Sequence, residues 1–229
     1  MIDLSVLIPA YLEDENLQII LPRIKEALAN NNINAEIVVI TSSLVKDETP
    51  QVCKKFNVTC INREGGENYG NAVRTGIKYA QGQYVLFMDA DGSHSPEFIQ
   101  SLYHQRDNAD IVVASRYVNN GGSDNSRVLI MMSRLLNFSY SIFFNINCKD
   151  ISNSFKLYNK KVFDGINLVS DNFDIIQEIL IKTLRKNRNL TILEIPYFFK
   201  ERMFGNTKRN LLLFVFGYVV TMLRLKLFK

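Results

Sequence analysis

Short apolar runs alternate with stretches of helical apolar spacing along the first half of the chain. Each run has the length of a buried strand, whereas the stretches between them repeat apolar residues every three or four positions. We expect strands at residues 4–8, 36–40, 57–62, 84–88 and 110–114, and helices at 16–29, 49–56, 70–80 and from Pro96. This alternation predicts an α/β fold with right-handed crossovers, in which a mostly parallel sheet carries helices on both faces.

Polar or turn-forming residues follow four of these strands. They are Pro9, Ala10 and Tyr11; Thr41, Ser42 and Ser43; Asp89, Ala90 and Asp91; and Ser115 and Arg116. Open α/β sheets bind ligands at the carboxyl ends of their strands. The pattern therefore predicts that these four loops converge on one crevice.

The pattern changes after residue 120. A loop at 119–124 precedes an amphipathic helix at 127–144 that is rich in large apolar residues, and we expect a strand at 150–158, a helix at 172–186 and a strand at 191–197. A final apolar stretch, residues 211–223, is shorter than the roughly 20 residues that a spanning helix needs. It predicts either a buried core helix or a helix lying in a membrane surface with a basic end.

Length and composition narrow the possible domain organisation, partners and compartment of the protein only slightly. The chain has 229 residues, enough for one domain with a small appendage, and we expect a catalytic domain over 1–209 and a membrane-surface helix over 210–229. A net charge of +4 is no nucleic-acid signature by itself. Three cysteines without metal or redox spacing indicate free thiols in a reducing compartment, and no secretory signal follows Met1. These features predict a cytoplasmic protein.

The acidic loop Asp89-Ala90-Asp91 carries the clearest chemistry. Two carboxylates at positions i and i+2, directly after a buried strand, can both turn toward one divalent cation. Their hard oxygen ligands suit Mg²⁺ or Mn²⁺, which would bridge the phosphates of a nucleotide ligand. The alternative is a solvated turn. We expect His94 to support this loop rather than to bind the metal.

Several motifs resemble those of family-two glycosyltransferases with the A-type fold. The more general matches are residues 8–16, 70–76 and 87–97. Matches at 115–117, 121–122, 133–134, 150–158 and 202–208 resemble more specifically the polyprenol-phosphate mannosyltransferases. The resemblance runs from about residue 3 to about residue 210. It implies an A-type, Rossmann-like fold, a divalent metal and a lipid-phosphate acceptor.

The resemblance also implies roles for individual residues. Those expected around the nucleotide-sugar are Pro9, Ala10, Tyr11, Glu13, Asp89, Ala90 and Asp91, and those expected around the acceptor phosphate are Arg116, Ser133, Arg134, Arg202 and Lys208. Asp89 and Asp91 would hold the metal. Asp91, Arg116 and Arg202 are the expected catalytic residues, since arginine binds phosphate oxygens in a bidentate fork.

The chain departs from the family pattern at two positions. Ser93 stands where relatives often carry a glutamine that binds the metal. Relatives also carry acids after the second strand, whereas Thr41, Ser42 and Ser43 occupy this loop. The hydroxyls of Ser42 and Ser43 can still form hydrogen bonds with a nucleotide. Glu178 resembles an acidic family position that contacts the sugar, with a solvent-facing helix position as the alternative.

These observations predict inverting transfer of a hexose to polyprenyl or dolichyl phosphate on the cytoplasmic face of a membrane. The expected donor is a nucleoside-diphosphate sugar, GDP-mannose first among them. The protein would be peripheral, seated by the apolar helices at 127–144 and 210–229. Two alternatives are a family-two enzyme with a soluble or polysaccharide acceptor, and a nucleotide-binding protein without catalysis.

Overall fold

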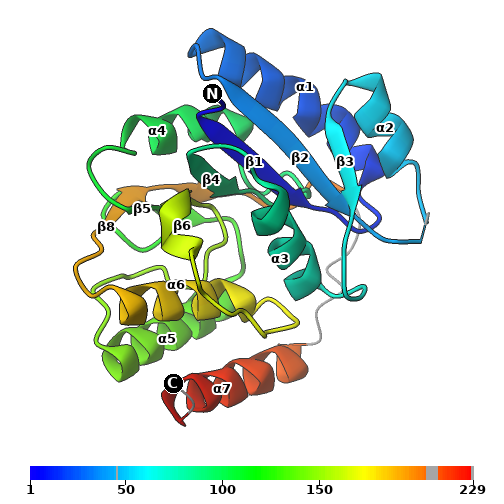
Figure 1. Ribbon diagram of the computed structural model, residues 1–229. Helices are drawn as coiled ribbons and strands as arrows, with labels where there is room; N and C mark the ends of the chain where they lie inside the picture. The colour runs from blue at the N-terminus through cyan, green and yellow to red at the C-terminus, as the bar shows by residue number, and fades with distance from the viewer. Residues whose placement is uncertain (45, 205–210, 228–229) are drawn as a thin grey trace.

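A single seven-stranded sheet forms the centre of the protein (Figure 1). The computed structural model describes residues 1–44, 46–204 and 211–227. The strands lie in the order β3-β2-β1-β4-β7-β5-β8, and their bounds are β1 Leu4–Pro9, β2 Ala35–Thr41, β3 Thr59–Asn62, β4 Tyr84–Phe87, β5 Ile111–Ser115, β7 Lys156–Asn159 and β8 Ile192–Pro196. Only β7 runs antiparallel to its neighbours in this sheet, β4 and β5. The expected mostly parallel sheet is confirmed.

Helices cover both faces of the sheet. The described helices are α1 Asp14–Asn30, α2 Thr49–Lys55, α3 Tyr69–Tyr79, α4 Ile99–His104, α5 Arg127–Phe144, α6 Ile175–Lys186 and α7 Leu211–Leu227, with 3₁₀ turns at Pro96–Phe98 and Lys160–Phe163. Side chains of β1 alternate between the faces, as a strand requires. Val6 and Ile8 pack in the core beneath α1, α2 and α4, and Leu7 packs in the core with α3 and α6. Two short strands, β6 Gly122–Ser123 and β9 Phe198–Phe199, form a separate parallel pair.

The prediction of a strand at 150–158 is wrong for its first half. Residues 150–155 form turns and irregular backbone, and β7 begins only at Lys156. The carboxylate of Asp150 is fully buried and accepts hydrogen bonds from the backbone N–H groups of Arg116 and Asn153. These bonds fold the backbone of residues 150–154 into a turn, and pairing with β5 begins at the Phe155 carbonyl oxygen, which accepts the Ala114 N–H.

Helix α5 presents most of its apolar side chains to the outside. Its range matches the expected helix, and Ser126 caps it by accepting a hydrogen bond from the Leu129 N–H. Only Asn137 and Tyr140 are buried. The exposed large apolar side chains of α5 are Val128, Leu129, Met131, Leu135, Phe138 and Ile142. This face finds no cover within the described chain.

The last helix, α7, packs beside α5 and α6 at one end of the molecule (Figure 1). The Tyr140 hydroxyl of α5 donates to the carbonyl oxygen of Tyr218 at 2.7 Å, and the Thr221 hydroxyl donates to the Asp174 carboxylate at 2.6 Å. Tyr218 and Leu225 are buried in the core. Among the described residues, no helix combines the length and the apolarity that crossing a membrane requires.

Replacing Thr221 by Val should weaken the attachment of α7. The hydrogen bond to Asp174 is buried, so its loss should lower the free energy of unfolding by about 1–2 kcal/mol. Urea denaturation measures the change. Thr59→Val, at an exposed position of β3, is the matched control and should stay within about 0.5 kcal/mol of the wild type. Equal stability of both variants would show that this contact does not hold α7.

Candidate active site

The acidic loop after β4 forms a rigid turn at the carboxyl edge of the sheet. The Asp89 carboxylate accepts hydrogen bonds from the Ser154 hydroxyl at 3.1 Å and from the Tyr69 hydroxyl at 3.4 Å. The Asp91 carboxylate accepts from the backbone N–H and the hydroxyl of Ser93, at 3.0 and 2.6 Å. Gly92 follows with a φ of +80°, a conformation that glycine adopts without strain. Both carboxylates are therefore fixed in place.

His94 supports the acidic loop from the interior of the protein. It is fully buried and stacks on Phe155, with ring centroids 4.5 Å apart. Its Nδ1 accepts the Asp89 backbone N–H at 2.9 Å, which places its own proton on Nε2, 3.2 Å from the Asn153 side-chain oxygen. Burial lowers the pKa of His94, so the ring is neutral at pH 7. This supporting role agrees with the expectation from the sequence.

The carboxylates of Asp89 and Asp91 are hard oxygen ligands that could hold a divalent cation. Mg²⁺ in such sites is held by one or two carboxylates, and substrate phosphates and water complete the shell. Within residues 1–44, 46–204 and 211–227 no cluster of three or more His, Cys, Asp or Glu side chains could enclose a metal. Ser93 directs its hydroxyl to the Asp91 carboxylate, so here it orients that group.

The expected nucleotide residues lie at the ends of β1 and β2. The Ala10 N–H donates to the Ile40 carbonyl oxygen at 2.9 Å, continuing the pairing of β1 with β2 beyond Pro9. The Tyr11 hydroxyl accepts from the Lys46 ammonium at 3.1 Å. Ser42 and Ser43, at the end of β2, direct their hydroxyls to the carboxylate of Glu67.

Arg63 is a residue of this region that the sequence analysis missed. It is buried, and its guanidinium donates to the carbonyl oxygens of Thr41, Glu67 and Ala10. It thereby joins the ends of β1 and β2 to the loop after β3. Burial lowers the pKa of Arg63, against the attraction of Glu67. Arg63 directly follows β3, so the strand-end rule applied to the third strand would have found it.

Glu13 and Arg202 form an ion pair between the two expected halves of the site. An Arg202 Nη atom lies 2.8 and 3.1 Å from the two carboxylate oxygens of Glu13. Burial raises the pKa of Glu13, although Arg202 opposes the shift. The Met203 N–H donates to the Asp91 carbonyl oxygen at 2.9 Å, so the segment that carries Arg202 lies against the acidic loop. Lys208 lies outside the described residues.

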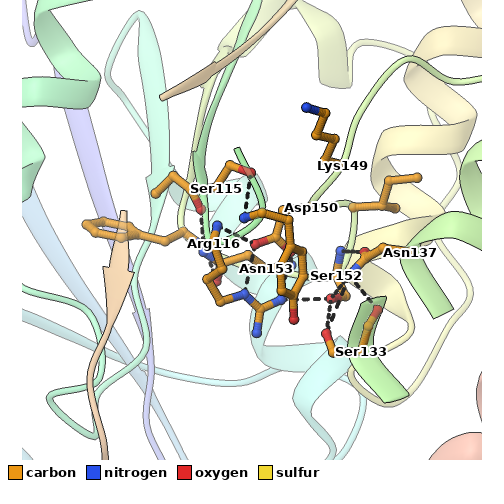
Figure 2. Close-up of polar contacts among 12 residues, drawn as sticks. Ser115, Arg116, Ser133, Asn137, Lys149, Asp150, Ser152 and Asn153 are labelled. Carbon is orange, nitrogen blue, oxygen red and sulfur yellow. Dashed lines mark hydrogen bonds and ion pairs between the residues drawn. The ribbon is translucent and has the colours of Figure 1, made fainter. Parts of the chain in front are cut away.

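Arg116 lies at the end of β5 in a second, deeper ion pair (Figure 2). Its Nε and one Nη atom contact the two oxygens of Asp150 at 2.8 and 2.7 Å, and the same Nη lies 3.0 Å from the Ser152 hydroxyl. The Arg116 side chain is 10% exposed and that of Asp150 is fully buried. Burial alone would raise the pKa of Asp150, but the charge and hydrogen bonds of Arg116 hold it below its usual value. Asp150 therefore occupies the Nε edge of the guanidinium, and Ser152 accepts a further hydrogen bond from the same Nη atom.

The polar side of α5 completes this cationic region. Asn137 donates to the Ser133 carbonyl oxygen at 2.8 Å and to the Ser152 hydroxyl at 3.1 Å, and the Ser133 hydroxyl lies 3.5 Å from that of Ser152 (Figure 2). The Tyr117 ring lies 5.0 Å from the guanidinium carbon of Arg116 and 5.4 Å from that of Arg134. The structure therefore brings together three of the expected acceptor residues, Arg116, Ser133 and Arg134.

Glu178 is not solvent-facing, which was one of the two alternatives expected for it. It is fully buried, and its carboxylate accepts the backbone N–H groups of Val169 and Ser170. Lys182, one turn along α6, pairs with it at 2.7 Å. Glu178 thus holds the 169–170 loop in place, because its carboxylate accepts hydrogen bonds from the backbone of that loop rather than from solvent.

The first two-thirds of the chain match a known protein family. Residues 5–166 match the family described as Glycosyl transferase family 2. The chain belongs to this family. The enzyme class expected from the sequence, a glycosyltransferase, is confirmed.

Two curated relatives extend the similarity beyond the family match. A dolichol-phosphate mannosyltransferase of Pyrococcus furiosus is 32% identical over 211 residues, covering 89% of this chain and 58% of its own length. A polyprenol monophosphomannose synthase of Mycolicibacterium smegmatis is 29% identical over 217 residues, covering 90% of this chain and 80% of its own length. The chain thus spans less than two-thirds of the Pyrococcus protein.

A solved structure confirms the fold class. Glucosyl-3-phosphoglycerate synthase from Mycobacterium tuberculosis, in complex with Mg²⁺ and uridine diphosphate, superimposes with a TM-score of 0.74. The alignment covers 97% of this chain and 79% of that one, at 16% sequence identity. The A-type glycosyltransferase fold expected from the sequence is confirmed.

Replacing Asp150 by Asn should strongly destabilise the protein. The substitution leaves the Arg116 guanidinium nearly buried without its counter-charge, a loss that typically costs about 3–5 kcal/mol. Chemical denaturation at pH 7 measures the change. Asp107→Asn is the matched control: its side chain is 70% exposed and pairs with Arg106, so its effect should stay below about 1 kcal/mol.

The effect of Asp150→Asn should also depend on pH. Because the folded-state pKa of Asp150 is lowered, its stabilisation is complete above the unfolded-state value of about 4 and is lost as the pH falls through the folded-state pKa. The difference in unfolding free energy between the wild type and Asp150→Asn should therefore shrink below about pH 4. A constant difference down to pH 2.5 would contradict the ion pair.

Proposed function

We propose that the protein transfers a hexose from a nucleoside-diphosphate sugar to a polyprenyl or dolichyl phosphate. The expected sugar is mannose, carried by GDP-mannose, and the expected product has inverted anomeric configuration. One observation carries the proposal: the 150–154 turn holds an acidic and a cationic region at one edge of the sheet. Ser154 contacts Asp89, and Asp150 contacts Arg116. The names of both curated relatives support a lipid-phosphate acceptor.

The donor is assigned to the loops at the ends of β1, β2 and β4. Pro9, Ala10, Tyr11, Glu13, Ser42 and Ser43 would surround its nucleoside, and Asp89, Ala90 and Asp91 would surround its diphosphate. Asp89 and Asp91 would hold Mg²⁺ or Mn²⁺, which supplies positive charge to the leaving diphosphate when bound. Glu13 keeps Arg202 close to the same diphosphate, since the two side chains form an ion pair.

The acceptor phosphate is assigned to the cationic region. Arg116, Ser133 and Arg134 would bind its oxygens, with Arg202 and Lys208 completing the set. A phosphate monoester is already ionised near neutral pH, so the reaction requires no strong general base. Catalysis then consists of placing one phosphate oxygen in line with the anomeric carbon and stabilising the leaving group. A single in-line displacement inverts that carbon.

Helices α5 and α7 are assigned to the membrane surface. The two helices lie at the same end of the molecule (Figure 1). Both expose large apolar side chains, and in α7 these are Val219, Val220, Leu223 and Leu227. Arg127, Arg134 and Lys226 add positive charge on the same two helices. Apolar area together with basic charge is the combination that binds helices to anionic lipid surfaces. We assign residues 1–209 to catalysis and 210–229 to this surface, on the cytoplasmic face.

Replacing Asp91 by Asn should abolish transfer while preserving the fold. The amide keeps the shape of the side chain but removes the charge that the cation needs, so the rate should fall about 100-fold or more. The measurement is formation of hexosyl lipid from GDP-mannose and polyprenyl phosphate, with circular dichroism as the folding check. Asp107→Asn is again the control, because Asp107 contacts Tyr84 at the amino end of β4, opposite the site. Wild-type rates in Asp91→Asn would refute the metal assignment.

A double substitution on α5 should release the protein from membranes. Leu135 and Phe138 are 66% and 63% exposed, so Leu135→Glu with Phe138→Glu should leave the core intact. Binding to vesicles of phosphatidylcholine and phosphatidylglycerol should fall at least about tenfold, since each side chain contributes about 1.5–3 kcal/mol when buried in lipid. Cosedimentation measures it. Ile19→Glu on α1, across the sheet, is the control and should bind as the wild type does. Unchanged binding of the double variant would remove α5 from the membrane contact.

A further inference from the structure

Glu67 places a carboxylate at the end of β2, although it belongs to the loop after β3. Its two oxygens accept the Ser42 hydroxyl at 2.6 Å and the Ser43 backbone N–H at 3.0 Å, together with the Ser43 hydroxyl. No lysine or arginine of the described chain forms an ion pair with Glu67, whereas Glu64 on the same loop pairs with Lys78 at 2.6 Å. Hydrogen bonds from Ser42 and Ser43 lower the pKa of Glu67 to about 2, so the group is ionised.

The backbone on both sides of Glu67 is fixed. Arg63 donates to the Glu67 carbonyl oxygen at 2.8 Å and to the Asn68 carbonyl oxygen at 3.4 Å. The Asn68 side chain caps α3 by accepting the Asn71 N–H at 2.8 Å. The loop therefore holds the Glu67 carboxylate in one position, as a recognition group requires.

The position of this carboxylate along the sheet edge fits one part of a nucleotide. Neighbouring strands lie about 4.8 Å apart, and β1 separates β4 from β2, so the ends of β4 and β2 are roughly 10 Å apart. A diphosphate bound at Asp89 and Asp91 places the ribose near β1, where Tyr11 lies. The base extends beyond the ribose, toward the end of β2 and Glu67.

We propose that Glu67 is the carboxylate that recognises the nucleobase of the donor and makes the site selective for guanine. Guanine presents the N1–H and the 2-amino group side by side, and a carboxylate offers two oxygens in a matching fork. Adenine presents an unprotonated N1 there, which a carboxylate repels. The exposed Ser43 hydroxyl can rotate away, which leaves one lone-pair position on each oxygen for the base. The inference rests on the proposed function, because it assumes that a nucleoside diphosphate binds at this edge of the sheet.

Calorimetric titration of nucleotides into Glu67→Gln tests the inference. GDP, IDP, ADP and 2′-deoxy-GDP are titrated in the presence of Mn²⁺. The wild type should bind GDP at least about tenfold more tightly than ADP, with IDP, which lacks the 2-amino group, in between. Glu67→Gln should lose about 10- to 100-fold in GDP affinity and little in ADP affinity, because charged hydrogen bonds are lost only with guanine. Glu64→Gln is the matched control on the same loop and should behave as the wild type.

Two results would overturn the role of Glu67 while the proposed function stands. Equal losses for GDP and ADP in Glu67→Gln would mean that the carboxylate only braces Ser42 and Ser43. A wild-type preference for GDP over 2′-deoxy-GDP that disappears in the variant would mean that it binds the ribose. Binding of no nucleotide by the wild type would instead remove the proposed function itself. Glu67→Asp, which retains the charge, should show an intermediate loss and serves if Glu67→Gln does not fold.

Discussion

The buried ion pair between Asp150 and Arg116 is the contact on which the arrangement of the site depends. Asp150 accepts hydrogen bonds from the backbone and side chain of Arg116 and from the Asn153 N–H, and these bonds fold the 150–154 turn. The turn then reaches the acidic loop through Ser154 and the polar side of α5 through Ser152. Burying two charges is costly, and such pairs contribute little net stability compared with an apolar core. The acidic region follows β4, whereas Arg116 of the cationic region follows β5. Here the ion pair orients these two regions relative to each other.

Periodicity was sufficient for the regular elements but not for this turn. The helix at 127–144 and the strands around β1, β2, β4 and β5 follow from apolar spacing, because burial of one face decides their conformation. The start of the strand at 150–158 was wrong because an acidic side chain, buried against an arginine 34 residues away, determined the backbone there. The spacing of apolar residues along a short segment contains no information on an ion pair between residues so far apart in the sequence.

The residues of the candidate site also fall into two groups: those that sequence patterns predict and those that only tertiary contacts place. The strand-end rule located Asp89, Asp91, Ser42 and Arg116, since it depends only on the direction of parallel strands. Glu67 could not be assigned to the end of β2, because its loop belongs to the next strand and its contact with Ser42 is tertiary. Glu178 was placed on a helix correctly, but its burial against the 169–170 loop depends on how that loop folds back. The C-terminal helix buries Tyr218 in the core and exposes Leu227, and its contact with a membrane stays a prediction.

The acceptor is the point that separates the proposed function from other activities of the family. The direct measurement incubates the wild-type protein and Mn²⁺ with GDP-mannose, GDP-glucose or UDP-glucose, together with polyprenyl phosphate and a soluble phosphomonoester. Mass spectrometry of the organic and aqueous phases then identifies the hexosylated product. The proposed function predicts a polyprenyl phosphate carrying one hexose in the organic phase, formed most rapidly from GDP-mannose. Hexose transferred only to the soluble acceptor, or to neither, would contradict it.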